Sequence, residues 1–412
     1  MVTLAASFRA PFPRYWLSKF LADFGDGVRL AAFPLLAAQL TRSPAAVAAV
    51  TAVQGLPWLL FGAGAGVIVD RSDSRRLMIT VDIIRAVIIA ALAVAILAHS
   101  AGLALIYVTA FVTGTGSALR DTAATTSVPR LVEPEYLEQA NGRLIAGQIV
   151  GSELAGPAAG GWLFGLAAVL PFAVNAGTLG IAVLLLLTLP SVFRPAPRDP
   201  DGRGLAPMRR DLREGFAWLW QHADIRDVTL AAGVVSAMDA AWFAVLVLYV
   251  IQILHQRPGA YGLLLAIGAL GGIVTGGLGA RVSGRLGPQR SLLLAGIVMA
   301  ATQAGLGLTS DVAVAAAMLF ASSAAWALFN LTAVTMRQRR VPAELLGRVS
   351  SLYGTVTRGT EALGAICGGL LAAAAGIRAP MLAGAVPLLA ATVLLAWRHR
   401  ARPGTAGGKS VS

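Results

Sequence analysis

The sequence predicts an all-α membrane protein whose twelve transmembrane helices form two pseudo-symmetric six-helix bundles. Of 412 residues, 57% are hydrophobic and only 13% are charged, a composition that soluble domains of this size do not have. Apolar runs long enough to cross about 30 Å of hydrocarbon recur from end to end. A carboxylate and three glycines recur without a gap at an offset of 208, because Glu153, Gly156, Gly160 and Gly161 are matched by Glu361, Gly364, Gly368 and Gly369. Such a repeat indicates two copies of one membrane unit.

Short polar links separate the expected spans. Within the spans, polar and apolar residues do not alternate one by one, as they do in the strands of a membrane β-barrel. The expected spans are 15–38, 45–69, 77–98, 103–126, 140–166, 169–189, 227–252, 259–281, 290–308, 312–335, 350–374 and 378–397. The expected domains are an N-terminal bundle (1–190), a cytoplasmic linker with an amphipathic helix (191–225), a C-terminal bundle (226–400) and a disordered tail (401–412).

The net charge of +13 comes mainly from arginines, which gather in one set of loops. The opposite set holds only Arg42, Arg257 and Arg378. This asymmetry predicts that both termini lie in the cytoplasm of a bacterium whose inner membrane holds the chain. Because membrane topology accounts for the positive charge, we expect no nucleic acid partner.

Motifs of catalysis and cofactor binding are missing from the sequence. It contains one cysteine, Cys367, and no phosphate-binding loop, zinc motif or nucleophile motif. We therefore expect no enzyme activity, no cofactor and no metal site. The expected chain is a monomer.

Span 1 carries charges at every third residue, at Asp23, Asp26 and Arg29. Charges inside the membrane cost at least about 2.5–3.5 kcal/mol each, so an unexplained one suggests a functional site. Asp26 and Arg29 are therefore candidates for proton coupling or the substrate cavity. The alternative is that the two side chains neutralise each other.

The link between spans 2 and 3 reads Gly66-Val67-Ile68-Val69-Asp70-Arg71-Ser72-Asp73-Ser74-Arg75-Arg76. This segment resembles a signature of the major facilitator superfamily of transporters, with Asp73 in place of the usual glycine. Span 5 contains Gly156-Pro157-Ala158-Ala159-Gly160-Gly161, which resembles the motif of antiporter branches. Further stretches resemble permeases of the macrolide-efflux and enterobactin-exporter type; they include Asp82-Ile83-Ile84-Arg85 and Arg340-Val341-Pro342-Ala343-Glu344. The resemblance covers nearly the whole chain and implies the major facilitator fold.

Span 5 is expected to bend at Pro157, because proline removes a backbone hydrogen bond. Small residues on the same span allow close approach of a neighbouring helix. We expect contact with span 8, where Gly268, Gly272 and Gly276 form a similar stripe. The functional interpretation is a hinge or seal made by Gly156, Pro157, Gly160 and Gly161, and the alternative is ordinary packing.

The charges near the link between spans 2 and 3 suggest a conformational latch in a protein of this family. Asp70 is expected to cap a helix of the other half. Arg75 and Arg76 are expected to pair with Asp121 on span 4. The remaining members proposed for this latch are Gly66, Arg71, Asp82 and Arg85. The alternative is that these charges only anchor the topology.

Three carboxylates in apolar spans are the main candidates for proton exchange. Glu153 and Asp239 have no charged neighbour one helical turn away, whereas Glu361 has Arg358. The family resemblance implies that their spans border a central cavity. An apolar cavity favours the protonated form of a lone carboxylate, so such a group can exchange a proton near neutral pH. The alternative role is a hydrogen bond between helices.

Aromatic residues are candidates for an apolar substrate pocket, although packing or lipid contact is the commoner role. They are Trp162, Trp242, Phe243, Trp326 and Phe329. The segment Met208–Trp220 predicts an amphipathic helix. This helix lies either on the membrane surface or against the protein's own inner face.

The expected function is proton-coupled efflux of an amphipathic small molecule, of the drug, macrolide or siderophore type, by alternating access. The expected partners are this substrate, protons and membrane lipids. A lysophospholipid flippase or an uptake symporter is the alternative. A non-transporting membrane sensor is a third hypothesis.

Overall fold

The computed structural model describes residues 11–128, 131–133, 136–189 and 205–400. Some side chains within the helices, including those of 58–59 and 61–71, also fall outside the description. The structure is all-helical over the part of the chain that it describes. It therefore confirms the predicted fold class.

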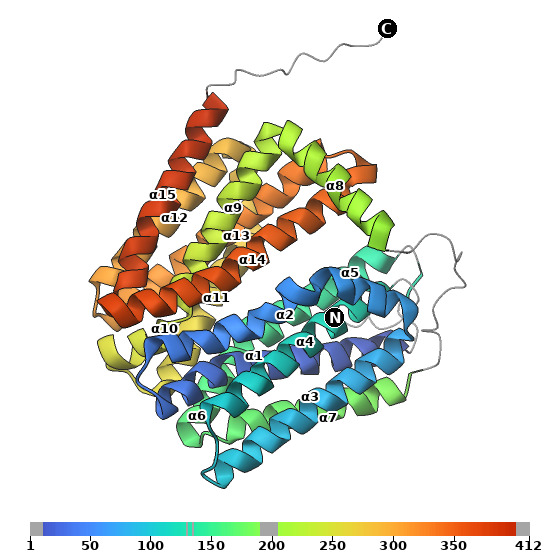
Figure 1. The fold of residues 1–412 in the computed structure, drawn as a ribbon, viewed down its shortest axis with the longest axis vertical. Coiled ribbons are helices and arrows are strands. Elements are labelled where there is room, and N and C mark those ends of the chain that lie inside the picture. The colour runs from blue at the N-terminus through green and yellow to red at the C-terminus, as the bar shows by residue number, and fades with distance from the viewer. Residues whose placement is uncertain (1–10, 129–130, 134–135, 190–204, 401–412) are drawn as a thin grey trace, which may run out of the picture.

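The first half of the chain supplies six membrane-length rods (Figure 1). They are α1 (Pro11–Leu40), α2 (Pro44–Arg71), α3 (Ser74–Leu97), α4 (Leu103–Ser127), the continuous rod α5 (Leu137–Gln148), η3 (Ile149–Ala155) and α6 (Gly156–Leu166), and α7 (Leu170–Leu187). The fifth rod thus contains a π-helical segment between two α-helices.

The second half supplies six more rods after the linker helix α8 (Leu205–Gln221). They are the rod α9 (Ala223–Phe243), α10 (Leu246–Leu248) and η5 (Tyr249–Ile253), then α11 (Pro258–Leu286), α12 (Pro288–Leu308), α13 (Val312–Arg340), α14 (Ala343–Ala375) and α15 (Ala379–Arg400). Eight helices of the described chain are long and apolar enough to cross a membrane by length and composition alone. The remaining rods are α1, α2, α5–η3–α6 and α14, where charged residues or undescribed side chains interrupt the apolar window.

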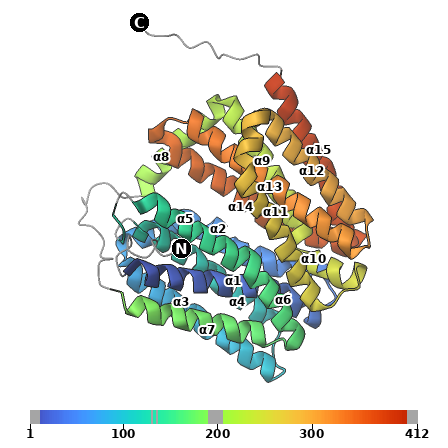
Figure 2. The same cartoon turned by 180° about the vertical axis from the view of Figure 1, so that it is seen from behind.

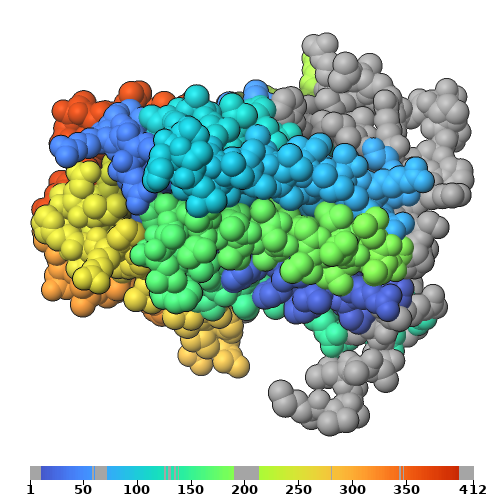
Figure 3. All heavy atoms as spheres, turned by 90° about the horizontal axis from the view of Figure 1, so that it is seen from below, coloured from blue at the N-terminus to red at the C-terminus, as the bar shows by residue number. Residues whose placement is uncertain are grey.

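The two halves are separate bundles that meet along one side (Figures 1 and 2). In the N-terminal half, α1 packs against α6 and α7, and α2 packs against α4. Helices α3 and α7 lie side by side on its outer surface (Figure 3). In the C-terminal half, α9 packs against α14, and α13 packs between α11 and α12.

We call the two ends of the bundle the linker end and the opposite end. The linker end carries the α2–α3 turn and the start of α9, and the opposite end carries the α1–α2 turn at Thr41. Packing between the halves uses the pairs α2–α14 and α6–α11. Small residues of α2, α14 and the α9–α10 junction form an apolar cluster between the halves, which includes Ala48, Ala244 and Ala372. These residues lie toward the opposite end.

The repeated glycine motif explains how these helices approach each other. A Cβ atom built on Gly156 would lie 2.7 Å from the Cα of Gly27 on α1. A Cβ atom built on Gly161 would lie 2.8 Å from the Cα of Gly262 on α11, in the other half. Since real Cβ atoms do not come this close to backbone, only glycine allows this packing.

The second copy of the motif repeats the arrangement 208 positions later. Gly364 and Gly368 lie against the backbone of α9 at Ala237 and Ala241, as Gly156 and Gly160 lie against α1. Gly369 lies against Ala45 and Ala48 of α2, as Gly161 lies against α11. In each copy, the first two glycines pack within a half and the third packs across the interface.

The expected contact between spans 5 and 8 is present, but the predicted stripe on span 8 does not make it. Gly268 lies against Ser323 and Leu319 of α13, and a Cβ atom on Gly276 would meet no described atom within 4 Å. The contact uses Gly262 instead, because it lies at the end of α11 where α6 approaches.

The expected bend at Pro157 extends further than one proline predicts. Pro157 is at the start of α6, and the seven residues before it form the π-helical segment η3. The N–H group of Gly156 donates to the carbonyl of Gly151, five residues back. Such wide turns inside an α-helix are uncommon and occur frequently at functional sites.

Helix α8 packs against the C-terminal half, which is one of the two positions that its sequence allows. Leu219 is buried in the core of the C-terminal half, and Gly215 lies against Arg348 of α14. Phe216 and Trp220, with stacked rings 5.4 Å apart, remain more than half exposed. One face of α8 therefore packs on the protein, and the other presents an aromatic pair.

Candidate functional site

A central chamber of about 310 Å³ lies between the two halves. The N-terminal half contributes Leu30 from α1, Glu153 from η3 and Pro157 from α6. The C-terminal half contributes residues of α9, α11 and α13, including Asp239, Trp242, Phe243, Leu264, Ser322 and Trp326. The wall is mostly apolar with a few polar groups, which is typical of small-molecule sites.

The chamber brings together two of the three predicted lone carboxylates, although 86 residues separate Glu153 and Asp239 in the chain. The indole N–H of Trp242 donates to Oδ1 of Asp239 at 3.2 Å. Glu361 lies within electrostatic range of Asp239 and lines an adjoining cavity. We call these three acidic side chains, which line the chamber and the adjoining cavity, the acidic region.

The aromatic candidates separate into three groups. Trp242, Phe243 and Trp326 line the chamber, as expected for a substrate pocket. Phe329 lines the adjoining cavity beside Glu361. Trp162 is 62% exposed and does not line the chamber.

A network of buried charges crosses the N-terminal half between α1, α3 and α4. Asp26 accepts hydrogen bonds from Arg29 at 3.2 Å, from the hydroxyl of Ser117 at 3.1 Å and from Arg85. Asp26 therefore does not pair with Arg29 alone, because α3 supplies a second guanidinium. This group of contacts lies in the membrane-spanning part of the helices.

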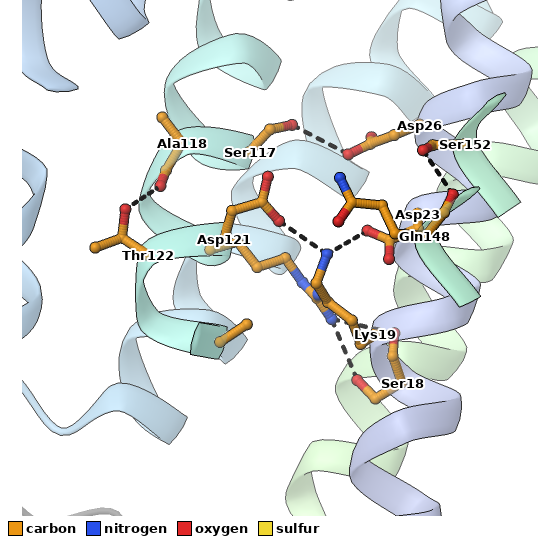
Figure 4. A network of polar contacts seen from close by, with 12 residues as sticks. Ser18, Lys19, Asp23, Asp26, Ser117, Ala118, Asp121, Thr122, Gln148 and Ser152 are labelled. Atoms are coloured by element: carbon orange, nitrogen blue, oxygen red, sulfur yellow. Dashed lines mark hydrogen bonds and ion pairs between the residues drawn. The ribbon is translucent and has the colours of Figure 1, made fainter. Parts of the chain in front are cut away.

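The network continues toward the linker end through Asp82 and Arg120. Asp82 is fully buried and accepts from Arg85 at 3.2 Å and from Arg120 at 2.7 Å. Lys19 bridges Asp23 at 2.5 Å and Asp121 at 2.9 Å (Figure 4). The network contains four acidic and four basic side chains, namely Asp23, Asp26, Asp82, Asp121, Lys19, Arg29, Arg85 and Arg120, so its formal charges cancel.

The predicted latch differs in detail from the observed contacts. Arg75 donates to the carbonyls of Leu186 and Leu187 at the end of α7, each at 2.7 Å, rather than to Asp121. The backbone N–H of Arg76 donates to Asp73, which caps α3. Asp121 accepts from Lys19 of α1 at 2.9 Å.

The side chains of Asp70 and Arg71, and the surroundings of Gly66, lie outside the described residues. Their expected roles in the latch therefore stay predictions. Asp82 and Arg85 do contact each other at i, i+3 as expected, but within the buried network of the N-terminal half.

Three members of the buried network, Lys19, Asp23 and Arg120, were not selected as candidates from the sequence. A signal for Lys19 was present, because Lys19 and Asp23 are four residues apart on one helix face. Arg120 carried no such signal, because its partner Asp82 is 38 residues away on another helix. The ion pair of Arg120 with Asp82 forms only because α4 packs against α3.

The described residues contain no group of three or more histidine, cysteine or acidic side chains that could hold a metal ion. Cys367 is a free, exposed thiol on α14.

Comparisons with known proteins identify the family. The family model described as transmembrane secretion effector, of the major facilitator group, matches residues 3–408. The multidrug efflux pump Tap of Mycolicibacterium fortuitum is 26% identical over 411 residues, which cover 96% of this chain and 97% of that protein. The macrolide efflux protein A of Enterococcus faecalis is 24% identical over 312 residues, which cover 73% of this chain and 93% of that protein.

Solved structures of low sequence identity share the fold. A bacterial homologue of the iron transporter ferroportin in an inward-facing state superposes with a TM-score of 0.74 at 16% identity, covering 94% of this chain and 98% of that chain. The nucleoside transporter NupG superposes with a TM-score of 0.72 at 14% identity, covering 95% of this chain and 99% of that chain. These proteins are transporters and not enzymes. The chain therefore belongs to the transmembrane secretion effector family, a branch of the major facilitator superfamily of membrane transporters.

Proposed function

We propose that this protein exports an amphipathic organic compound across the inner membrane of a bacterium in exchange for protons. The observation that carries the proposal is the convergence of Glu153 and Asp239 on an aromatic chamber between the two halves. Relatives described as multidrug and macrolide efflux proteins support the substrate class.

The coupling follows from competition in the chamber. A positively charged amphiphile is attracted to ionised carboxylates and to the faces of Trp242 and Trp326. A proton on the same carboxylate removes that attraction. Substrate and proton therefore bind in turn, which is the requirement for antiport.

Alternating access follows from the position of the contacts between the halves. The glycine contacts at Gly161 and Gly369 lie toward the opposite end, and the chamber lies between these contacts and the linker end. Rocking of the halves about this chamber would expose it first to one side and then to the other. The π-segment η3, which carries Glu153, lies at the junction that this motion would bend.

Inside-out membrane vesicles test the proposal directly. Vesicles from cells with the protein should accumulate a radiolabelled macrolide when a pH gradient, acid inside, is imposed. Vesicles from cells without the protein measure the background. Accumulation that persists unchanged after the gradient is collapsed with nigericin would refute proton coupling.

A further inference from the structure

Two grooves run from the linker end toward the central chamber, one on each half. The N-terminal groove has a volume of about 590 Å³ and lies between α1 and α5. The C-terminal groove has a volume of about 350 Å³ and lies between α9, α13 and α14.

The two grooves share equivalent positions on α5 and its continuation η3 in one half and on α14 in the other. At the offset of 208 that relates the glycine motifs, Ala146 corresponds to Gly354 and Val150 to Arg358. The first member of each pair lines the N-terminal groove and the second lines the C-terminal groove. The same helix face has thus been kept in both halves, whereas its chemistry has changed.

The N-terminal groove is apolar and aromatic. Trp16 and Phe20 stack with their ring centroids 5.5 Å apart, and Phe12 and Val150 extend the apolar wall. The indole N–H of Trp16 donates to the carbonyl of Arg143 at 3.0 Å. Because the indole N–H of Trp16 already has a partner, Trp16 presents mainly its apolar ring faces to the groove.

The C-terminal groove is the more polar of the two, although Ala232, Val235, Trp326, Phe329 and Tyr353 also line it. Ser236, Asn330, Thr357, Arg358 and Glu361 all line it. The side chains of Ser236, Asn330 and Glu361 make no hydrogen bond to any residue that the structure describes. A ligand with hydroxyl and carbonyl groups could therefore satisfy them without displacing a protein contact.

The C-terminal groove adjoins the central chamber, because Trp326 is a wall of both. The N-terminal groove lies farther along the fifth rod, where Val150 of the groove precedes Glu153 of the chamber by three residues. A molecule in the chamber thus borders the C-terminal groove and lies close in sequence to the end of the N-terminal groove.

We propose that the two halves divide substrate recognition, so that the substrate is a facially amphipathic molecule. Its apolar face lies on the groove of Trp16 and Phe20, and its oxygen-rich face lies on the groove of Ser236 and Asn330. A positively charged group on the same molecule lies at the acidic region between them. This proposal rests on the proposed transport function but concerns binding alone.

Binding to the detergent-purified full chain, without any proton gradient, tests this division. The probes are a 14-membered macrolide and the derivative from which its neutral sugar has been removed, and both keep their amino sugar. Isothermal titration calorimetry measures both affinities for the wild type, Asn330→Leu and Trp16→Ala. Thr355→Val is the matched control, because Thr355 is exposed on the same helix α14 but does not line the groove.

Asn330→Leu should weaken binding of the intact macrolide by about tenfold, as loss of hydrogen bonds to a buried ligand does, and change binding of the derivative by less than about twofold. Trp16→Ala should weaken binding of both probes by a similar factor, because it removes only apolar contact. Equal effects of Asn330→Leu on both probes, or no binding of either probe to the wild type, would overturn the proposal.

Because the measurement needs no gradient, it separates this proposal from proton coupling. Transport that proves independent of the gradient would leave the binding result intact. Thermal unfolding of each variant shows whether it folds. If Trp16→Ala unfolds, Phe20→Leu makes the same prediction, since it removes an aromatic face from the same groove.

Discussion

Asp239 is the residue whose substitution tests proton coupling, because an amide at this position imitates the protonated carboxyl group. Asp239→Asn keeps an oxygen that accepts the hydrogen bond from Trp242, so the chamber should keep its shape. The amide cannot take up a proton. We therefore expect transport by this variant to lose its dependence on the pH gradient, measured as macrolide uptake into vesicles at several imposed gradients.

Asp311→Asn is the matched control for this substitution. Asp311 caps α13 by accepting from Ala313 and Val314 at an exposed helix start, and asparagine caps helices equally well. This control should transport like the wild type. Gradient-dependent transport by Asp239→Asn would instead assign the proton to another group.

Arg85 tests the buried charge network of the N-terminal half. Arg85→Ala would leave Asp26 and Asp82 with one guanidinium fewer in a site where Arg85 is fully buried. Removal of one partner of a buried ion pair costs about 3–5 kcal/mol, so we expect a clear fall in the thermal unfolding temperature in detergent.

A surface arginine provides the comparison. Arg378 donates to the hydroxyl of Ser310 at an exposed position, where a lost contact costs about 0–1 kcal/mol. Arg378→Ala should therefore unfold close to the wild-type temperature. If Arg85→Ala did the same, the network would contribute little to stability, and its charges would be kept for another reason.

At the scale of the element, the glycines of α6 and α14 act as contacts rather than as flexible joints. Gly161→Leu should prevent close packing of α6 on α11, because even its Cβ atom would meet the backbone of Gly262. Overpacking of this kind costs about 1–3 kcal/mol. Such a cost shifts an equilibrium between two conformations by roughly 5- to 150-fold.

Accessibility of a cysteine in the chamber measures this shift. In a Cys367→Ala background, Leu265→Cys should react faster with a membrane-impermeant maleimide from outside the cell when Gly161→Leu is also present. Gly165→Leu is the control on the same helix, because a Cβ atom there would lie 3.9 Å from its nearest described neighbour. Equal labelling in both variants would mean that this contact does not close the outer side.

The rod α5–η3–α6 also shows the limit of local sequence rules. A proline predicts an interruption of the helix, and the structure has one. The length and type of the irregularity depend on packing, because Gly151, inside η3, lies against the backbone of α1 at Phe20 and Phe24. No pattern within span 5 contains that information.

At the scale of the whole molecule, the distribution of arginine predicts the orientation. We expect the linker end to face the cytoplasm, because nearly all loop arginines lie there. In the Cys367→Ala background, Thr41→Cys should react with an impermeant maleimide in intact cells. Gln289→Cys, exposed in the α11–α12 turn, should react only after the cells are opened. The reverse pattern would invert the topology.

The pseudo-symmetry of the molecule has a functional consequence. The two halves keep the same glycine contacts and an equivalent glutamate, at Glu153 and Glu361, but differ in the side chains that line their grooves. Under the proposed function, the symmetric scaffold would let the halves rock about one centre, and the asymmetric walls would suit a substrate with two different faces.

The sequence by itself determined the fold class, the twelve spans, the internal repeat and the short list of acidic residues. These follow from composition and spacing, because a bilayer requires long apolar helices and makes intramembrane charges rare. Its motifs also indicated the superfamily, which the comparisons confirm. The sequence also predicted a helix in the linker and its amphipathic character.

Only the tertiary structure decided which of these residues share a site. It places Glu153 and Asp239 on the wall of one chamber, joins Arg120 to Asp82, directs Arg75 to α7 rather than to Asp121, and leaves Trp162 outside the chamber lining. The physical reason is that one amphipathic pattern does not specify which helix packs against which face. Contacts between distant helices form only when all the rods are packed together, so their pairing is a property of the assembled bundle.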